Sequence, residues 1–448
     1  MTVITRLLPR QVNQFFSGKT GRAAAVTMLL FASLRLGDAA MFFSRIFLGR
    51  YLPPLFFGAI DPFFSVLAVI TLPVQIAGII LIRTISSAAE QNDNETIRSS
   101  IFSTLVFAAM ISIFFLGFVL VFQSYILSRL HLQSSVYIVI LAATAALSAW
   151  PILFSSILQG LKRFAFISAL AVGQPMFSAG LILFFTVYLK LQLPGVLSAR
   201  FAAELLAVFA AFVVVIPLLK GAKFQLKMPY SIKTILVKPS AWLRNDIVPV
   251  SIFIISSSVL LHFDRLFVRN YLTAFSGGYG AILSLGQIPL YLASPVKMVL
   301  FPIASAQHAS GTSLDHAMRK MLLAGIAGTV CCFIFFHFAG GLILSFWRAE
   351  FISFAAGLTL YSLNMCVEVV LQLAGHIQIA RRRYNGFFLM SAVIFIVCTL
   401  LYYFSASIDI SRLLVVTLIT RIVCAGILFT ETPLCLSALT GKLRGLLR

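Results

Sequence analysis

Apolar runs of about twenty residues or more follow one another along almost the whole chain, with few charges inside them. A run of this length can cross the hydrocarbon core of a bilayer as a helix. Hydrophobic residues make up 60% of the 448 residues and charged residues only 10%, whereas soluble domains are about half apolar and a quarter charged. The sequence therefore predicts an all-α polytopic membrane protein without a separate soluble domain.

The apolar runs predict twelve membrane spans. The basic, polar stretch 1–21 precedes an apolar run that is too long for the core of a cleavable signal peptide, so we expect no such peptide. We place the spans at 22–48, 56–82, 99–125, 134–158, 164–189, 194–219, 247–270, 276–304, 319–346, 351–376, 386–405 and 411–435.

Lysine and arginine are distributed unevenly between alternate loops. One side of this topology holds twenty-two of them, together with both termini, and the opposite side holds eight. Because cytoplasmic loops are enriched in lysine and arginine, both termini are expected in the cytoplasm. The formal charge of +21 therefore reflects topology and does not indicate a nucleic-acid partner.

A segment near the start recurs 220 residues downstream. Residues 45–58 read R-I-F-L-G-R-Y-L-P-P-L-F-F-G, and residues 265–278 read R-L-F-V-R-N-Y-L-T-A-F-S-G-G. Duplicated halves in a membrane protein usually enclose a substrate path, so the repeat favours a transporter. It predicts a six-helix lobe at 1–219, a basic cytoplasmic linker at 220–246 and a second six-helix lobe at 247–448.

Ionisable residues inside spans are costly, so they usually face a cavity or a partner. Arg35 and Asp38 are three residues apart and share one face of the first span. They form either a self-neutralising pair between helices or part of a cavity, where the arginine can bind a phosphate with two hydrogen bonds.

The repeat places Arg45 and Arg265 at equivalent positions, at the outer ends of spans one and seven. Asp61 and Asp264 either counter these arginines or carry a coupling cation, and the sequence does not separate the two roles. The structural alternative is that all four are interfacial charges that pair with each other and with lipid headgroups.

Lys297 is the only lysine deep in a predicted span. Pro295 lies two residues earlier, and Pro73 has a similar place in span two, so both spans are expected to be kinked. Matched kinks suit helices that bend during transport, although a static kink is equally compatible. Lys297 then lines the substrate path, or reaches the interface if it lies nearer the cytoplasm.

Glu368 in span ten shares a face with Asn364 and Gln372 and has no obvious local partner. It is either a protonatable carboxylate for ion coupling or an interhelical hydrogen-bonding group. Arg200 and Glu204, four residues apart, are expected to form a structural pair within one helix.

The sequence contains no catalytic constellation. It has no phosphate-binding lysine loop, which excludes ATP hydrolysis by this chain. The six cysteines and six histidines lack the spacing of metal ligands. We therefore expect a protein that is not an enzyme and that holds neither a metal nor a resident cofactor.

Three segments carry a family resemblance. They are residues 45–58 with their continuation to I-S-S-A-A-E-Q-N-D, I-L-Q-G-L-K-R-F at 157–164, and D-R-L-F-V-R-N-Y-L with its continuation to F-P-I-A-S-A at 264–306. Together they resemble the polysaccharide-transport branch of the MOP exporter superfamily, which includes the Wzx-type O-antigen flippases of lipopolysaccharide biosynthesis.

The resemblance implies a MATE-like fold, with two six-helix lobes around a central cavity lined by spans one, two, seven and eight. The implied substrate is an undecaprenyl-diphosphate-linked oligosaccharide, which moves from the inner to the outer leaflet of a bacterial inner membrane. Alternating access would be coupled to a proton or sodium gradient. Membrane lipids and the glycan polymerase machinery are the implied partners.

The residues expected to line this cavity are four cations and three acids, which is a small positive excess for an anionic substrate. They are Arg35, Asp38, Arg45, Asp61, Asp264, Arg265 and Lys297. Asp38 and Glu368 are the candidates for ion coupling. Arg83 and Arg319, near the cytoplasmic mouth, are expected to attract the substrate electrostatically.

Three other functions compete with this prediction. A MATE-type exporter of cationic drugs would depend on buried carboxylates such as Asp38 and Glu368. A MurJ-type lipid II flippase normally has fourteen spans. A scaffold for a glycan-assembly complex would not transport at all, and loss of transport on mutation of cavity residues alone separates it from a transporter.

Overall fold

A computed structural model describes residues 19–132, 134–161, 163–219, 247–294, 316–380 and 383–430. All regular elements in these ranges are helical. The α-helices are α2 (Lys19–Tyr51), α3 (Pro54–Ile70), α4 (Leu72–Glu90), α5 (Asn94–Val121), α6 (Gln123–Leu130), α7 (Val136–Gly160), α8 (Phe164–Leu183), α9 (Gln192–Val215), α12 (Val248–Tyr271), α13 (Ser276–Gly286), α15 (His316–Trp347), α16 (Ala355–Ala380), α17 (Asn385–Tyr403) and α18 (Ile410–Thr430).

The length and composition of these helices identify a multi-pass membrane protein. Within the described ranges, nine helices are long and apolar enough to cross a bilayer, or ten if α3 and α4 form one bent span. A helix suits this environment because it satisfies its backbone hydrogen bonds internally. Helix α2 and the segment formed by α13 and residues 288–294 occupy the other two expected spans. The layout is consistent with twelve helices.

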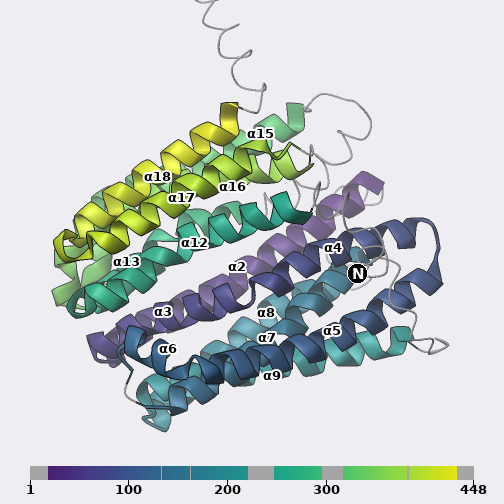
Figure 1. Ribbon diagram of the computed structural model, residues 1–448, viewed down its shortest axis with the longest axis horizontal. Coiled ribbons are helices and arrows are strands. Elements are labelled where there is room, and N and C mark those ends of the chain that lie inside the picture. The colour runs from purple at the N-terminus through teal and green to yellow at the C-terminus, as the bar shows by residue number, and fades with distance from the viewer. Residues whose placement is uncertain are drawn as a thin grey trace, which may run out of the picture.

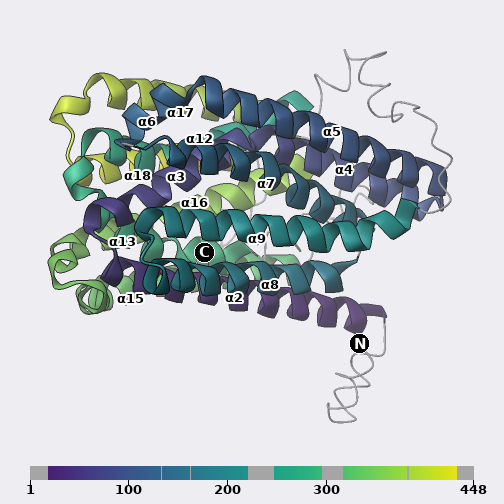
Figure 2. The same ribbon diagram turned by 90° about the horizontal axis from the view of Figure 1, so that it is seen from below.

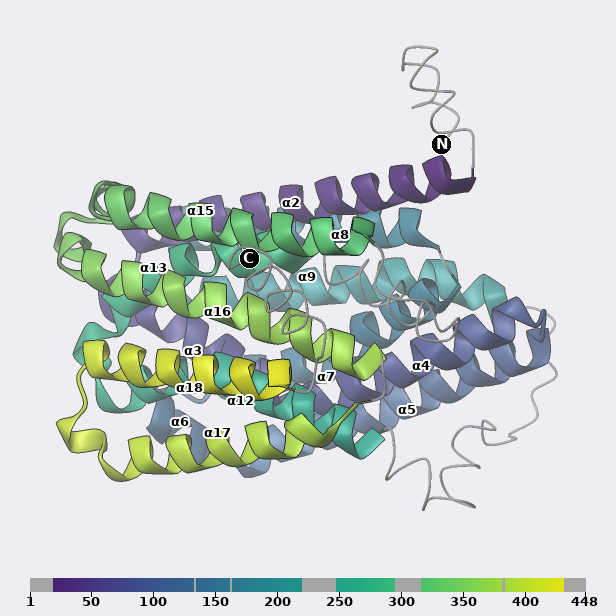
Figure 3. The same ribbon diagram turned by 90° about the horizontal axis from the view of Figure 1, so that it is seen from above.

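The helices form two groups that lie side by side (Figure 1). In the first group, α2 packs on α8, and α7 packs on α4, α5 and α9. Figure 2 shows this group in front. In the second group, α16 packs on α13, α15 and α18, and α12 packs on α17. Figure 3 shows the second group in front. The expected linker, 220–246, lies outside the described residues.

The sequence repeat appears as repeated local structure. Helix α2 ends at Tyr51 and α12 ends at Tyr271, which are equivalent positions 220 residues apart. In each helix the final tyrosine packs on the phenylalanine one turn before it. The ring centroids are 5.8 Å apart for Phe47 and Tyr51 and 4.9 Å apart for Phe267 and Tyr271. The repeat therefore sets the same helix end in both groups.

A kink interrupts the second span, as its proline predicts. Helices α3 and α4 are bent by 52° at a break that lies two residues before Pro73. Proline is tolerated there because the first turn of a helix leaves its N–H groups unpaired. In the second group, α13 ends at Gly286 and the helix resumes at Ile288. Pro295 and Lys297 lie outside the described residues.

Candidate functional site

The two groups meet along α3, which packs against α12 and α13. The closest approach involves Gly58 and Gly277. A β-carbon at Gly58 would overlap the backbone of Ser276, and one at Gly277 would lie 2.7 Å from the carbonyl oxygen of Pro54. Only glycine permits such a close approach of backbones. We call the end of the molecule formed by residues 51–54 and 271–276 the closed end.

Two arginines cap each other's helices at the closed end. Arg348 of the second group donates to the carbonyl oxygens of Arg50 and Leu52, at 3.1 and 2.8 Å, where α2 ends. Arg50 donates in return to the carbonyl of Phe346, where α15 ends. The last carbonyls of a helix lack partners within it and carry partial negative charge. The two groups therefore satisfy each other's helix ends.

Arg269 adds a third contact at this end and is buried, with only 1% of its surface exposed. It donates to the carbonyls of Leu130 and Leu55 at 2.8 and 2.9 Å. Arg50, Arg269 and Arg348 are three of the eight cations that the sequence predicts on the outer side, and the sequence pattern assigns them no role. The signal available was that Arg269 replaces Gly49 of the first repeat, so it breaks the duplication.

Arg45 and Asp61 form a partly buried ion pair next to the closed end. Their Nη1 and Oδ1 atoms are 2.5 Å apart, and the same Nη1 lies 3.5 Å from the Ser284 hydroxyl of the second group. Asp61 is only 5% exposed. The first group thus places Arg45, whose charge is balanced by Asp61, in contact with the second group.

Arg265, the repeat partner of Arg45, reaches the same boundary from the second group. It is 7% exposed, interacts electrostatically with Asp61, and its Nε has no hydrogen-bond partner. Tyr291, which follows α13 in the second group, lies near both arginines and near Asp61 and Asp38. The fold therefore brings the two repeat-related arginines into one cluster.

Arg35 and Asp38 extend this cluster along α2. They pair at 3.0 Å, and Arg35 also donates to the Ser294 hydroxyl of the second group at 2.8 Å. Asp38 remains the more exposed partner, with 38% of its side chain accessible. We define the boundary cluster as Arg35, Asp38, Arg45, Asp61 and Arg265.

The boundary cluster has unsatisfied hydrogen-bonding capacity. Eight buried side-chain atoms in the described ranges have no hydrogen-bond partner, and three of them are Arg35 Nε, Asp61 Oδ2 and Arg265 Nε. Native proteins contain few such atoms because each one costs free energy. With three arginines and two aspartates, the cluster also carries excess positive charge. The two unpaired arginine Nε groups suit an anionic ligand that accepts hydrogen bonds from them, whereas Asp61 Oδ2 can only accept.

Asp264 does not face the boundary cluster. It is fully buried, and its carboxylate accepts hydrogen bonds from the Tyr279 hydroxyl at 2.7 Å and the Arg265 backbone N–H at 2.8 Å. Tyr279 belongs to α13 of the same group, so Asp264 points into that group. Consecutive helical residues point in different directions because a turn holds 3.6 residues. Asp264 and Arg265 therefore face different surroundings, although they are adjacent in the sequence.

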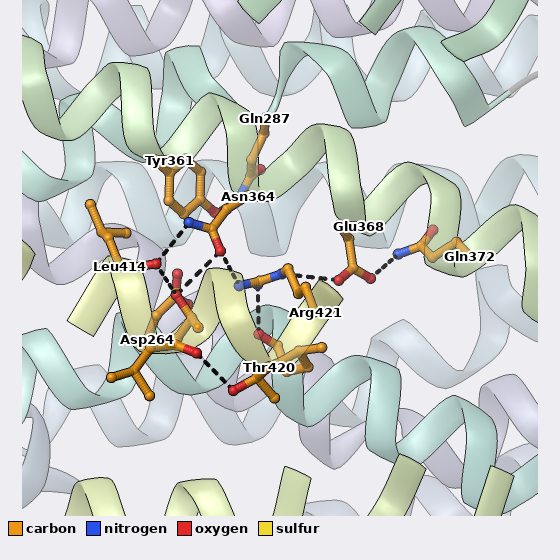
Figure 4. Close-up of polar contacts among 12 residues, drawn as sticks. Asp264, Gln287, Tyr361, Asn364, Glu368, Gln372, Leu414, Thr420 and Arg421 are labelled. Atoms are coloured by element: carbon orange, nitrogen blue, oxygen red, sulfur yellow. Dashed lines mark hydrogen bonds and ion pairs between the residues drawn. The ribbon is translucent and has the colours of Figure 1, made fainter. Parts of the chain in front are cut away.

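Glu368 has partners that the sequence did not reveal (Figure 4). One carboxylate oxygen accepts from Arg421 at 3.1 Å and the other from Gln372 at 2.8 Å. Arg421 also donates to Asn364 and to the carbonyl of Leu260, each at 2.9 Å. Glu368 and Arg421 are both fully buried. This network joins α12, α16 and α18 inside the second group.

The boundary cluster, as defined, does not include the remaining predicted residues. Arg200 and Glu204 form the expected pair within α9. Arg83 lies on α4 and Arg319 on α15, and Lys297 is outside the described residues. No group of three or more histidine, cysteine, aspartate or glutamate side chains in the described parts of the chain is arranged to bind a metal ion.

No protein-family model and no curated protein matches this sequence. Solved structures share its fold at low identity. An outward-facing multidrug resistance MATE family transporter of the MOP superfamily is 14% identical, with a TM-score of 0.68 over 92% of this chain and 96% of its own. A Vibrio cholerae MATE transporter is 13% identical, with a TM-score of 0.64 over 91% and 96%. The lipid II flippase MurJ is 13% identical, with a TM-score of 0.63 over 90% and 87%.

Proposed function

We propose that this chain is a MOP-type exporter of the polysaccharide-transport branch. It moves an undecaprenyl-diphosphate-linked oligosaccharide from the inner to the outer leaflet of a bacterial inner membrane. One observation carries the proposal: Arg45 and Arg265, equivalent residues of the two repeats, both lie near Asp61 at the boundary between the helical groups. The two groups are the two lobes of the exporter, joined by residues 220–246.

The boundary cluster binds the diphosphate. Guanidinium groups match phosphate oxygens with two parallel hydrogen bonds, and the partnerless Nε of Arg265 is one available donor. Asp61 holds Arg45 while the site is empty, because an unpaired buried charge is costly. The diphosphate then competes with Asp61 for Arg45, while the lipid tail stays in the bilayer.

The closed end is the outer gate of this exporter. Both termini are cytoplasmic in the proposed orientation, so the substrate enters from the opposite end, near Arg83 and Arg319. These cations attract the anionic headgroup. Separation of the lobes at the closed end then releases the substrate outward, where the glycan polymerase machinery receives it. A proton or sodium gradient drives the cycle, with Asp38 at the boundary as the candidate coupling carboxylate.

The test uses a strain deleted for this gene and complemented with wild type, Arg45→Ala, Arg265→Ala or Arg412→Ala. Loss of one charged hydrogen-bonding group costs about 1.5–3 kcal/mol, which corresponds to about a 10- to 100-fold loss of export. We expect lipid-linked oligosaccharide to accumulate on the cytoplasmic side and surface glycan to fall in the two cluster variants. Arg412 is a matched control, because its side chain is 68% exposed and it does not belong to the boundary cluster.

The same strains discriminate the rival functions. Asp38 is the exposed acid of the boundary cluster, so a MATE-type cation exporter is the second candidate. Unchanged surface glycan with increased sensitivity to cationic dyes would favour that exporter. Accumulation of lipid II would favour a MurJ-like flippase. If deletion abolishes surface glycan but both alanine variants restore it fully, the chain is a scaffold and the proposed site is wrong.

A further inference from the structure

His262 contacts the first helical group from α12, one turn before Arg265. The two residues are three apart in one helix, so their side chains share a face of α12. The His262 Nδ1 lies 3.0 Å from the Ser65 hydroxyl, which belongs to α3 of the first group. His262 is half-buried and Ser65 is fully buried. The imidazole ring therefore lies at the boundary between the groups.

The hydrogen bonds of Ser65 determine which imidazole nitrogen carries the proton. A serine hydroxyl has a single hydrogen atom, and Ser65 donates it to the carbonyl oxygen of Asp61 at 2.8 Å. The same hydroxyl can then only accept from His262, so Nδ1 carries a hydrogen atom. If Ser65 donated to His262 instead, two acceptors would lie 2.8 Å apart with no proton between them.

The other ring nitrogen, Nε2, is a free hydrogen-bond acceptor. A second proton on the ring would place a cation one turn from Arg265, which is itself a buried cation, so the imidazole is neutral. Among the described residues, no group donates a hydrogen bond to Nε2. Nε2 is not one of the eight buried atoms in these ranges that lack a partner, so a ligand can reach it.

Asp61 supplies a second acceptor without a donor. Its Oδ1 pairs with Arg45, but its Oδ2 has no hydrogen-bond partner and lies where a β-carbon at Gly280 of α13 would be 3.8 Å away. The Ser65 hydroxyl joins the Asp61 backbone to the His262 ring, so both acceptors belong to one neighbourhood. A fully ionised phosphate offers only acceptors. These two atoms therefore require a ligand group with O–H or N–H donors.

We infer that His262 recognises the sugar next to the diphosphate, because its Nε2 accepts a hydrogen bond from a hydroxyl or amide N–H of that sugar. The unpaired Nε groups of Arg35 and Arg265 donate to the diphosphate, and Asp61 Oδ2 is a further acceptor for the sugar. This inference deepens the proposed function and rests on it, since it requires a sugar diphosphate at the boundary cluster.

Two other ligands fit Nε2 less well. A metal ion needs several protein ligands, and in the part of the chain that the structure describes no group of three or more histidine, cysteine, aspartate or glutamate side chains is arranged to bind one. A cationic N–H donor would lie close to Arg265, which repels it. A neutral sugar donor meets neither obstacle.

Binding to the purified full-length protein tests this role with two probes of equal charge. The first is farnesyl diphosphate esterified at its terminal phosphate with N-acetylglucosamine, which offers hydroxyl and amide donors. The second carries a methyl group there and has no sugar. In wild type the sugar probe should bind more tightly than the methyl probe.

Two variants separate sugar binding from the contact with Ser65. In His262→Asn the amide nitrogen can donate to Ser65 as Nδ1 does, but no acceptor remains at the position of Nε2. In His262→Gln the amide oxygen can occupy that position as an acceptor. His262→Asn should therefore lower the affinity for the sugar probe about 2- to 10-fold, the contribution of one neutral hydrogen bond, and His262→Gln should keep it.

Two controls accompany these variants. The methyl probe should bind wild type, His262→Asn and His262→Gln equally, because its binding does not involve the acceptor, and it also reports correct folding. His337→Asn changes an exposed histidine of α15 and should bind both probes as wild type does.

The outcomes distinguish the inference from the proposed function. Wild-type affinity for the sugar probe in His262→Asn would overturn the inference, and so would loss of methyl-probe binding in both His262 variants, which would assign the residue to the fold. Equal binding of both probes by wild type would overturn it too and leave the anion site intact. Failure of wild type to bind either probe, or binding that Arg265→Ala leaves unchanged, would instead remove the anion site on which the proposed function depends.

Discussion

The buried arginines of this protein differ in what neutralises them. Arg421 is held by the Glu368 carboxylate, and Arg269 is held by backbone carbonyls. Among the described residues, the Arg265 side chain has neither kind of partner at hydrogen-bonding distance, and its Nε is unsatisfied. A buried guanidinium without its full set of partners costs free energy unless a ligand supplies them. That difference separates the arginine proposed to bind substrate from those that stabilise the fold.

At the residue scale, the Glu368–Arg421 pair should dominate the stability of the second group. Glu368→Gln leaves Arg421 as a fully buried charge without a counter-ion. Breaking a buried pair in this way costs about 3–5 kcal/mol, whereas replacing both partners with apolar residues of similar volume is often neutral. Thermal unfolding in detergent should therefore show a large loss for Glu368→Gln and recovery in the double variant Glu368→Leu with Arg421→Met.

The Arg200–Glu204 pair provides the comparison for these unfolding measurements. Arg200 is one-third exposed, so Glu204→Gln leaves a partly solvated charge and should cost at most about 1 kcal/mol. Equal losses for Glu204→Gln and Glu368→Gln would contradict the assignment of Glu368 to a structural network.

At the scale of helices, backbone contact between α3 and α13 determines how the closed end is sealed. Gly58 packs directly on Ser276 and Gly277, so side chains do not separate the two helices there. The arginine caps act at the same end, between α2 and α15. Packing and hydrogen bonding therefore favour the same closed arrangement.

Gly58→Leu should open the closed end. Its side chain cannot occupy the space filled by the backbone of Ser276, and overpacking costs about 1–3 kcal/mol. A cysteine at position 276, in a background without the six native cysteines, should react with a water-soluble thiol reagent about tenfold faster or more in the Gly58→Leu protein.

Gly117→Leu is the matched control for this experiment. A β-carbon at Gly117 would meet nothing within 4 Å, so the reactivity at position 276 should stay unchanged. Protection that persists in Gly58→Leu would show that glycine is not required for closure.

At the scale of the whole molecule, the hydrogen bonds between described residues of the two groups lie from the level of Arg35 to the closed end. They connect α2, α3 and α6 with α12, α13 and α15. An exporter that alternates access must break the contacts at its outer gate in every cycle. The energy of these contacts is then part of the barrier between its two states.

A reversible cross-link across the closed end should stop export. The His131 imidazole lies 3.1 Å from the carbonyl of Asn270 in the opposite group, and both sites are accessible. With cysteines at both positions, a reducible bifunctional reagent should abolish export in proportion to the cross-linked fraction, and reduction should restore it. The measurement is surface glycan in the complemented deletion strain.

A second cysteine pair controls for cross-linking itself. Tyr271 and Tyr402 belong to the same group, with ring centroids 6.2 Å apart. Joining these positions should leave export intact, because the two helices move together. Export that survives the 131–270 cross-link would exclude separation of the groups at this end.

The sequence alone determined the helices, the equivalent ends of α2 and α12, the shared helix face of Arg35 and Asp38, and the ion pair Arg200–Glu204 within one helix. These features depend on local quantities. In lipid, a helix must satisfy its backbone hydrogen bonds internally. Residues three or four apart in a helix are neighbours on its surface. A sequence is sufficient to read them.

Only the tertiary structure decided which helices touch and with which face. In the tertiary structure Glu368 pairs with Arg421, and Asp264 contacts Tyr279 inside the second group and does not face the boundary cluster. Arg348 contacts the end of α2. The axial rotation of a helix is set by many small packing contacts with neighbours that are distant in the chain. No single spacing in the sequence encodes that rotation. The rotation determines which charged side chains lie at the boundary between the two halves.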